Sequence, residues 1–373
     1  MIRGGKQIRI ALSVAVVIAL ASAGGWWWRA AATRDRVAAI IPTQPDRLRA
    51  ASELQARVNE AEARARGLRQ PLDGLADLAR LYHANGFAAQ AAECARALMQ
   101  LEPSNALWPY LQAHMMGGYG DLEGALPLLQ RAIELAPNYA PARVRLGDAL
   151  LKQNEAERAA QTYRDALSRD PGNGYASIGL ARVEIAAGNE TAARDRLLKL
   201  VAAQPMFAPA WGLLIGIDER LGDRTAAETH RLHARNAGTS REMPDPWIDE
   251  LMAYCYDAYQ LAVAAAAADP MNNQARARQL LERAVSVAPN DDLPRRLLGN
   301  LLSDLGELSS ARLFLEQATV FAPKEPDNWS HLVRVLKAMG DISAASRAVD
   351  VGLEHCPDSA VLHLERGRRL AAA

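Results

Sequence analysis

Few residues of this 373-residue chain have the types and spacing that chemistry requires. His230 and His233 are three residues apart, so a helix would place both imidazoles on one face, as a metal site needs. No third ligand follows at a metal-binding spacing. His355 and Cys356 are adjacent at an expected helix end, with no obvious acidic partner. We therefore expect no metal site and no catalytic residue here.

The three cysteines, Cys94, Cys255 and Cys356, are far apart and form no C-x-x-C pair. An odd number at such spacing predicts neither a disulfide framework nor a zinc site. We interpret them as small apolar residues on helices.

Other catalytic motifs are missing from the sequence. It has no glycine-rich phosphate loop after a strand, no H-E-x-x-H, no C-x-x-C-H and no G-x-S-x-G. The chain has 43 basic residues (lysine and arginine) and 43 acidic residues (aspartate and glutamate), and no block of one sign. Nucleic acid is therefore not an expected partner. The chain is predicted not to be an enzyme, with no cofactor and no small-molecule substrate.

Composition and periodicity point to an all-α repeat protein. Half of the residues are apolar but only 5% are aromatic, and alanine and leucine dominate, which favours helices over strands. Prolines recur every 34 residues, at 103, 137, 171 and 205 and again at 289, 323 and 357. A fixed period of this length is typical of a solenoid.

Two further positions of the period agree. Twelve residues before each proline, or its equivalent Thr239, stands an alanine, at 91, 125, 159, 193, 227, 277, 311 and 345. Seventeen residues before it stands a glycine or asparagine, at 86, 120, 154, 188, 222, 272, 306 and 340. These residue types tolerate a left-handed backbone and mark the turn between two helices. Each block is therefore predicted as helix, turn, helix and terminating proline.

The pattern resembles the tetratricopeptide repeat family: an early tryptophan or leucine, a leucine before a small residue, the turn glycine, the alanine, a bulky residue and the proline. Trp211 and Trp329 stand at the early aromatic place, and Leu146-Gly147 and Leu298-Gly299 at the next. The resemblance covers about residues 72–357. It implies a right-handed α-solenoid of about eight repeats whose inner groove binds peptides or protein surfaces.

The register breaks between Pro205 and Pro289, which are 84 residues apart, two repeats plus 16. The extra residues contain Asp245, expected as a helix N-cap, and Pro246 at the first helical position. One long helix is predicted from about Pro246 to Ala268. Trp247, Tyr254, Tyr256 and Tyr259 concentrate aromatics here, so the insertion is either a spacer or a recognition element.

The N-terminus has the features of an export segment. Arg3, Lys6 and Arg9 precede an uncharged run from Ile10 to Trp28. This run is long enough to cross a bilayer, and the tryptophans at its end would lie at the membrane interface. We therefore prefer the interpretation of an uncleaved membrane anchor. Cleavage near Ala23 is the alternative. The body is expected in the periplasm or extracytoplasmic space, attached to the inner membrane by one span, or free in the periplasm after cleavage.

The predicted organisation has six parts: a signal anchor or signal peptide at 1–30, a tether and lead helix at 31–71, five repeats at 72–239, an insertion and helix start at 240–257, three repeats at 258–357 and a capping helix at 358–373. The tether ends near Pro45 and the lead helix covers 46–66. That helix is expected to cap the first repeat, with dimerisation as the alternative.

Groove residues are carried over from the family onto the first helix of each repeat. In the first array they are Arg80, His83, Tyr110, His114, Asp148, Lys152, Tyr175, Arg182, Glu219 and Arg220, joined by Trp247 of the insertion and Arg334 of the second array. The resemblance, taken together with the N-terminal segment, indicates a membrane-tethered scaffold that binds proteins or peptides. A periplasmic accessory module, which presents a peptide or carrier to an enzyme in trans, remains the alternative.

Overall fold

The computed structural model describes residues 25, 27–50, 52–237, 243–268 and 274–372. The chain divides into two compact units, Met1–Tyr254 and Cys255–Ala373, called unit 1 and unit 2 below. Every regular element among the described residues is a helix, which confirms the all-α prediction.

Unit 1 contains a lead segment, five helical hairpins and a short helical segment after them. The lead consists of η1 (Asp46–Ala50) and α2 (Ser52–Ala65). The hairpins are α3 (Pro71–Ala84) with α4 (Ala88–Leu101), α5 (Leu107–Gly118) with α6 (Leu122–Leu135), α7 (Ala140–Lys152) with α8 (Ala156–Arg169), α9 (Gly174–Ala186) with α10 (Glu190–Ala203) and α11 (Ala208–Leu221) with α12 (Arg224–Ala237). They are followed by α13 (Pro246–Leu251) and η2 (Met252–Tyr254).

Unit 2 contains three hairpins and a terminal helix. The hairpins are α14 (Ala258–Ala267) with α15 (Gln274–Val287), α16 (Asp292–Asp304) with α17 (Leu308–Phe321) and α18 (Pro326–Ala338) with α19 (Ile342–His355). Helix α20 (Ala360–Ala372) packs on α18 and α19, as expected of a cap. The eight hairpins are the eight blocks predicted from the period.

The turn residues adopt the backbone conformation that their types predict. Positive φ angles occur at Gly86, Gly120, Asn154, Gly188, Gly222, Gly306 and Gly340. Asn154, at 61°, is the one non-glycine residue with this conformation in the described part of the chain. Asn272 lies outside the described residues.

Small residues allow the two helices of a hairpin to approach closely. The recurrent alanines are all buried: Ala91, Ala125, Ala159, Ala193, Ala227, Ala277, Ala311 and Ala345. A methyl group added at Gly147 would lie 2.5 Å from the ring of Tyr163, which occupies the bulky position of the facing helix. The register therefore encodes packing at these positions, as predicted.

The N-terminal part differs from its prediction. Residues 27–38 are helical, although 31–38 were expected to belong to the tether and 27–30 to the signal segment. Pro42 and Pro45 follow outside any helix. The apolar stripe of α2, which includes Leu54 and Val58, is buried and packs on α3 in the manner of a cap. None of the described helices is long and apolar enough to cross a membrane. Most of the proposed span, residues 10–24 and Trp26, lies outside the described residues.

The prediction of one long helix from Pro246 to Ala268 is wrong. Helix α13 ends at Leu251, a 3-10 turn follows, and residues 255–257 are not helical. Asp257 begins a new helix because its carboxylate accepts the backbone N–H groups of Tyr259 and Gln260, at 2.9 and 3.1 Å. The break separates the aromatic cluster between the two units.

Candidate protein-binding groove

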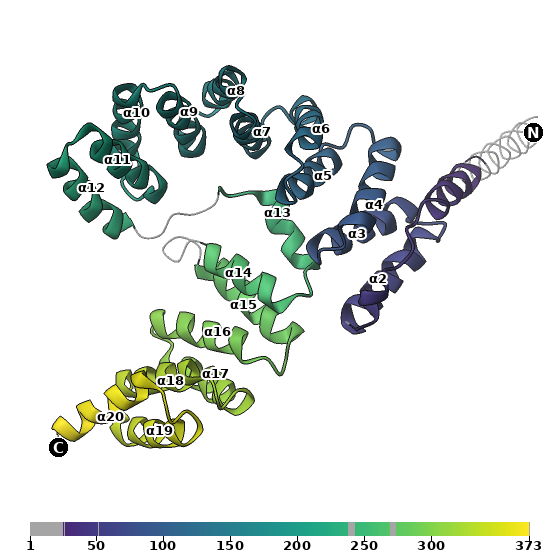
Figure 1. Ribbon diagram of the computed structural model, residues 1–373. Helices are drawn as coiled ribbons and strands as arrows, with labels where there is room; N and C mark the ends of the chain where they lie inside the picture. The colour runs from purple at the N-terminus through teal and green to yellow at the C-terminus, as the bar shows by residue number, and fades with distance from the viewer. Residues whose placement is uncertain (1–24, 26, 51, 238–242, 269–273, 373) are drawn as a thin grey trace, which may run out of the picture. The chain divides into compact units, whose positions relative to one another are not determined.

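The inner side of unit 1 is occupied by a segment of the same chain. Figure 1 shows the first helices of the hairpins lining the inner side of this unit, with α13 next to α3 and α5. We call residues 244–254 the docking segment, and the surface that holds it, on α3, α5 and the start of α7, the groove. The docking segment contacts residues that precede it by 100 to 177 positions.

Asp245 is the most deeply buried polar residue of the docking segment, with an exposed fraction of 4%. Its carboxylate accepts hydrogen bonds from the hydroxyls of Tyr110 and Tyr139. Arg145 donates to the same carboxylate from Nη2 at 2.9 Å and from Nε at 3.1 Å. Burial raises the pKa of both phenols, so they remain protonated donors. Two phenols and one guanidinium therefore satisfy a buried anion.

Trp247 extends this contact with a large apolar surface. Its ring stacks on Tyr139 at 3.7 Å between centroids and 15° between planes, and meets Tyr110 edge-on at 5.2 Å. The Trp247 backbone N–H donates to the Tyr139 hydroxyl at 3.1 Å. Asp245 also caps α13, as predicted, by accepting from the N–H of Ile248 at 3.3 Å. The cap and the groove contact thus share one carboxylate.

The other end of the docking segment is fixed by Tyr254. Its hydroxyl donates to Asp77 at 3.2 Å, and its carbonyl accepts from the side-chain amide of Asn85 at 2.8 Å. The guanidinium of Arg80 lies 5.6 Å from the Tyr254 ring and 5.2 Å from the Trp108 ring. Such a cation–π arrangement is favourable when partly desolvated.

His83 and His114 stack on each other in the groove wall, with ring centroids 5.6 Å apart and ring nitrogens 3.4 Å apart. Burial lowers the pKa of His83 to about 4. Burial, followed by the charge of Arg145, lowers the pKa of His114 to about 3. Both imidazoles are therefore neutral near pH 7, so they add hydrogen-bonding surface to the groove and no charge.

The predicted groove residues of the later repeats contact neighbouring side chains or lie at the surface. Asp148 accepts from the hydroxyl of Tyr163 at 2.7 Å and lies 4.0 Å from Arg182. Tyr175 packs edge-on against Phe207 at 5.0 Å. The remaining members lie near the surface: Lys152 is exposed, Glu219 pairs with Arg231, and Arg220 lies 3.7 Å from Glu190.

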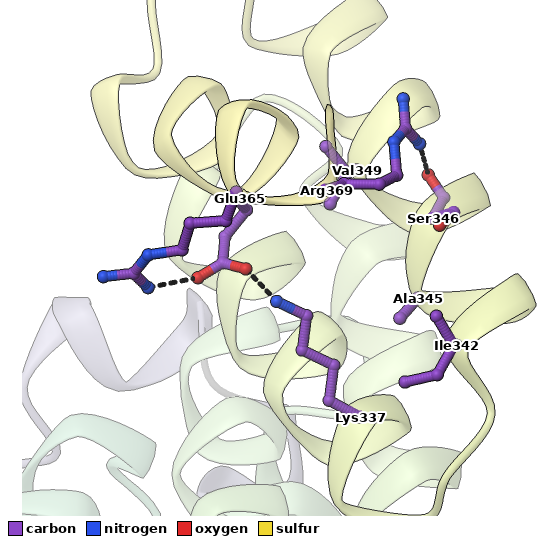
Figure 2. Close-up of a pocket in the computed structure, with 8 residues that line it drawn as sticks. Lys337, Ile342, Ala345, Ser346, Val349, Glu365 and Arg369 are labelled. Carbon is purple, nitrogen blue, oxygen red and sulfur yellow. Dashed lines mark hydrogen bonds and ion pairs between the residues drawn. The ribbon is translucent and has the colours of Figure 1, made fainter. Parts of the chain in front are cut away.

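In unit 2, the predicted residue Arg334 is exposed and donates to Asn300 at 3.1 Å. A cavity of about 390 Å³ opens nearby between α18, α19 and α20. Figure 2 shows that Glu365 accepts from Lys337 and that Arg369 donates to the Ser346 carbonyl. Glu365 also accepts from Arg368 at 3.0 Å. The Lys337 ammonium lowers the pKa of Glu365.

The histidine pair has a structural role. Nδ1 of His230 lies 2.6 Å from the fully buried carboxylate of Asp218, which also accepts from Arg194 at 2.6 Å. His233 stacks on Trp211 at 4.7 Å. Among the described residues, no group of three or more metal-ligating side chains converges.

The cysteines are likewise buried and free. Burial raises the pKa of the Cys94 thiol to about 12, which makes it a poor nucleophile. Cys94 lies on α4, whereas Cys255 and Cys356 lie just outside helices.

Sequence reasoning missed Tyr139, Arg145 and Asp77 as groove residues. Asp77 and Arg145 share one position of the period, directly before the recurrent leucine, where Leu111, Gly179 and Leu213 stand in the other repeats of unit 1. Charged residues at a place otherwise taken by leucine or glycine were the available signal. Tyr256 belongs to the other unit, where Arg283 lies 4.9 Å from its ring.

Comparison with known proteins agrees with the register. The family model described as tetratricopeptide repeat matches residues 118–165 and 154–215. The match supports the resemblance of this chain to the tetratricopeptide repeat family. The matched ranges include α6 to α10 and most of α11.

Curated relatives match part of the chain. Cellulose synthase 1 operon protein C of Komagataeibacter xylinus is 31% identical over 115 residues, which is 30% of this chain and 8% of that protein. Cellulose synthase operon protein C of Escherichia coli K12 is 34% identical over 83 residues, 22% of this chain and 7% of that protein. The chain thus spans a small part of the length of these relatives.

A solved tetratricopeptide repeat protein from Parabacteroides merdae has 16% identity and a TM-score of 0.41, and the alignment covers 72% of this chain and 99% of that one.

Proposed function

We propose that this protein is a non-catalytic scaffold that binds peptides or protein surfaces in the groove of its helical repeats. One observation carries the proposal: the groove holds the docking segment through Tyr110, Tyr139 and Arg145, which meet a buried aspartate and a tryptophan. Tyrosine, tryptophan and arginine are the residue types that dominate the energetics of protein interfaces. A repeat array also offers the extended concave surface that such binding uses.

The N-terminal residues support a tether to the inner membrane, with the body in the periplasm or another extracytoplasmic space. The support is the basic head with Arg3, Lys6 and Arg9 and the uncharged run that ends at Trp28. Fractionation should then recover the full-length chain with membranes after an alkaline wash. Recovery in a soluble periplasmic fraction with Gly24 as the first residue would instead establish cleavage.

An accessory role beside an enzyme is the second candidate function. The names of the relatives place them in cellulose synthase operons, so those proteins are encoded together with an enzyme. By this candidate, the groove presents a peptide or carrier to an enzyme in trans. The two candidates predict different partners: structural envelope proteins for a scaffold and an enzyme subunit for an accessory module.

Site-specific crosslinking in cells tests the binding role. A photoreactive amino acid replaces Arg182, whose exposed side chain lies on the first helix of its repeat, and in a matched variant replaces the exposed Gln161 on the second helix α8. We expect a small set of protein adducts at residue 182 that is absent at residue 161. The same diffuse background at both positions would contradict the proposal. The identity of the adducts separates the scaffold from the accessory module.

A further inference from the structure

The docking segment has the pattern of a helical peptide ligand. Trp247, Leu251 and Tyr254 are spaced i, i+4 and i+7, which puts them on one face of a helical turn. Leu251 is 2% exposed, and the other two contact groove side chains. Asp249, on the opposite face, and Glu250, at the edge of the apolar face, are exposed. An apolar face toward a groove and an acidic face toward solvent is the arrangement of a bound amphipathic helix.

The docking segment is not paired within a hairpin of its own. Each hairpin helix packs on the helix next to it in sequence, whereas α13 contacts α3 and α5, which belong to the first and second hairpins. It makes polar contacts with five residues that are at least 100 positions away: Asp77, Asn85, Tyr110, Tyr139 and Arg145. These contacts recognise side chains at defined positions of the segment, as a binding site does.

Charge adds selectivity to this site. Residues 244–254 contain Asp245, Asp249 and Glu250 and no lysine or arginine. The groove places the guanidinium groups of Arg145 and Arg80 against this segment. Asp245 enters between two phenols, where a lysine or a neutral side chain of the same length would leave Arg145 without its carboxylate.

We infer that the groove of α3, α5 and α7 is a binding site for an acidic amphipathic helical segment of a partner protein, which competes with the docking segment of this chain. The partner segment carries an aspartate, an aromatic residue two positions later, and further apolar residues four and seven positions after that aromatic residue. The inference rests on the proposed binding function and names the chemistry of the partner. The docking segment then keeps the groove closed until such a partner is present.

Competition sets the size of the expected effect. A ligand that binds only the open form has its apparent affinity reduced by the fraction of molecules that are open. If the docking segment is bound in about nine of ten molecules, releasing it should tighten ligand binding about tenfold. Variants that release the segment without touching the groove therefore measure its occupancy.

The test uses a synthetic peptide of residues 243–254, isotope-labelled and carrying a fluorophore, and the full-length chain. The receptor is Asp245→Ala combined with Trp247→Ala, which disables the docking segment and leaves every groove residue in place. We expect saturable binding that is at least about tenfold tighter than to the wild-type chain. Adding Arg145→Met to this receptor, or making the same two alanine changes in the peptide, should abolish binding.

Two results would overturn the inference. One is a double variant that retains its helical circular dichroism and cooperative unfolding but binds the peptide no better than wild type does. The other uses the wild-type chain and so applies even if that variant fails to fold. In this chain, we expect saturating peptide to displace the docking segment and to speed amide hydrogen exchange in residues 247–254. Unchanged exchange at about millimolar peptide, the effective concentration of a tethered segment, would refute competition.

Failure here is distinguishable from failure of the binding function. If the peptide does not bind but residue 182 still yields specific adducts in cells, the scaffold uses another surface and the docking segment is a spacer. If neither experiment gives a specific product, the proposed function itself fails.

Discussion

Arg145→Met is the substitution that tests the groove contact most directly. It removes the guanidinium that donates to Asp245 at 2.9 and 3.1 Å and to the Tyr110 hydroxyl at 2.8 Å, and keeps most of the aliphatic side chain. Hydrogen bonds to a charged group contribute about 1.5–3 kcal/mol each, and an isolated buried charge costs more. We expect unit 1 to lose about 2–4 kcal/mol of unfolding free energy.

The loss of unfolding free energy has an upper limit, because the docking segment can leave the groove and Asp245 is then hydrated by water. Once it has left, further changes within the contact cost nothing. Arg145→Met, Asp245→Ala and the double variant should therefore show nearly equal losses, so the coupling energy between the two residues should be about as large as one single loss, about 2–4 kcal/mol. The denaturant m-value should fall in all three, because less surface is then buried in the native state.

Urea unfolding followed by circular dichroism measures these losses, with Arg182→Met as the matched control. Arg182 is half-exposed and its nearest carboxylate, that of Asp148, is 4.0 Å away, so its removal should change stability by less than about 0.5 kcal/mol. Additive losses from the two single variants, or a loss at Arg145 no larger than at Arg182, would refute the account of a buried, shared carboxylate.

Two further predictions concern the repeat packing and the groove histidines. Gly147→Ala should destabilise unit 1 by about 1–3 kcal/mol, because its methyl group would lie 2.5 Å from Tyr163, whereas Gly212→Ala has open space and should raise stability slightly in the same thermal melt. Equal shifts for the two variants would show that the small residue is not required for packing. Folding lowers the pKa of His83 and His114 to about 4 and 3, so between about pH 4 and 6.5 the unfolded chain binds more protons, and stability should fall by about 1–2 kcal/mol per histidine by pH 5. Replacing both with glutamine should flatten the stability-against-pH curve over this window, and an unchanged slope would contradict the burial of neutral imidazoles.

The period of 34 determines the eight hairpins because their packing is local. Each recurrent residue acts on a neighbour within its own block or the next, as Gly147 does with Tyr163. Helix ends follow from residue chemistry as well, as the positive φ of Asn154 shows. Such features are predictable because the residues that cause them are close in sequence.

The groove contact was not predictable in the same way, since Asp245 and Tyr110 are 135 positions apart. Local pattern identifies Asp245 as an N-cap, which is correct, but does not reveal that Tyr139 and Arg145 hold the same carboxylate. The long helix predicted across residues 246–268 failed for a related reason. Apolar periodicity continues through the sequence, while the 3-10 turn ends at Tyr254, whose side chain and carbonyl are held by α3 and its C-cap.

The 16 extra residues and two of the four aromatics near them have one structural cause. After α12 ends at Ala237, the chain must return from the fifth hairpin to the first three, and a strict 34-residue repeat has no residues to spare for that path. Two of the four aromatics, Trp247 and Tyr254, meet the groove, whereas Tyr256 and Tyr259 belong to unit 2. A pure spacer would need the length but not the aspartate or the tryptophan. Both are present and both are engaged with the groove, as the proposed competition between the docking segment and a partner segment requires.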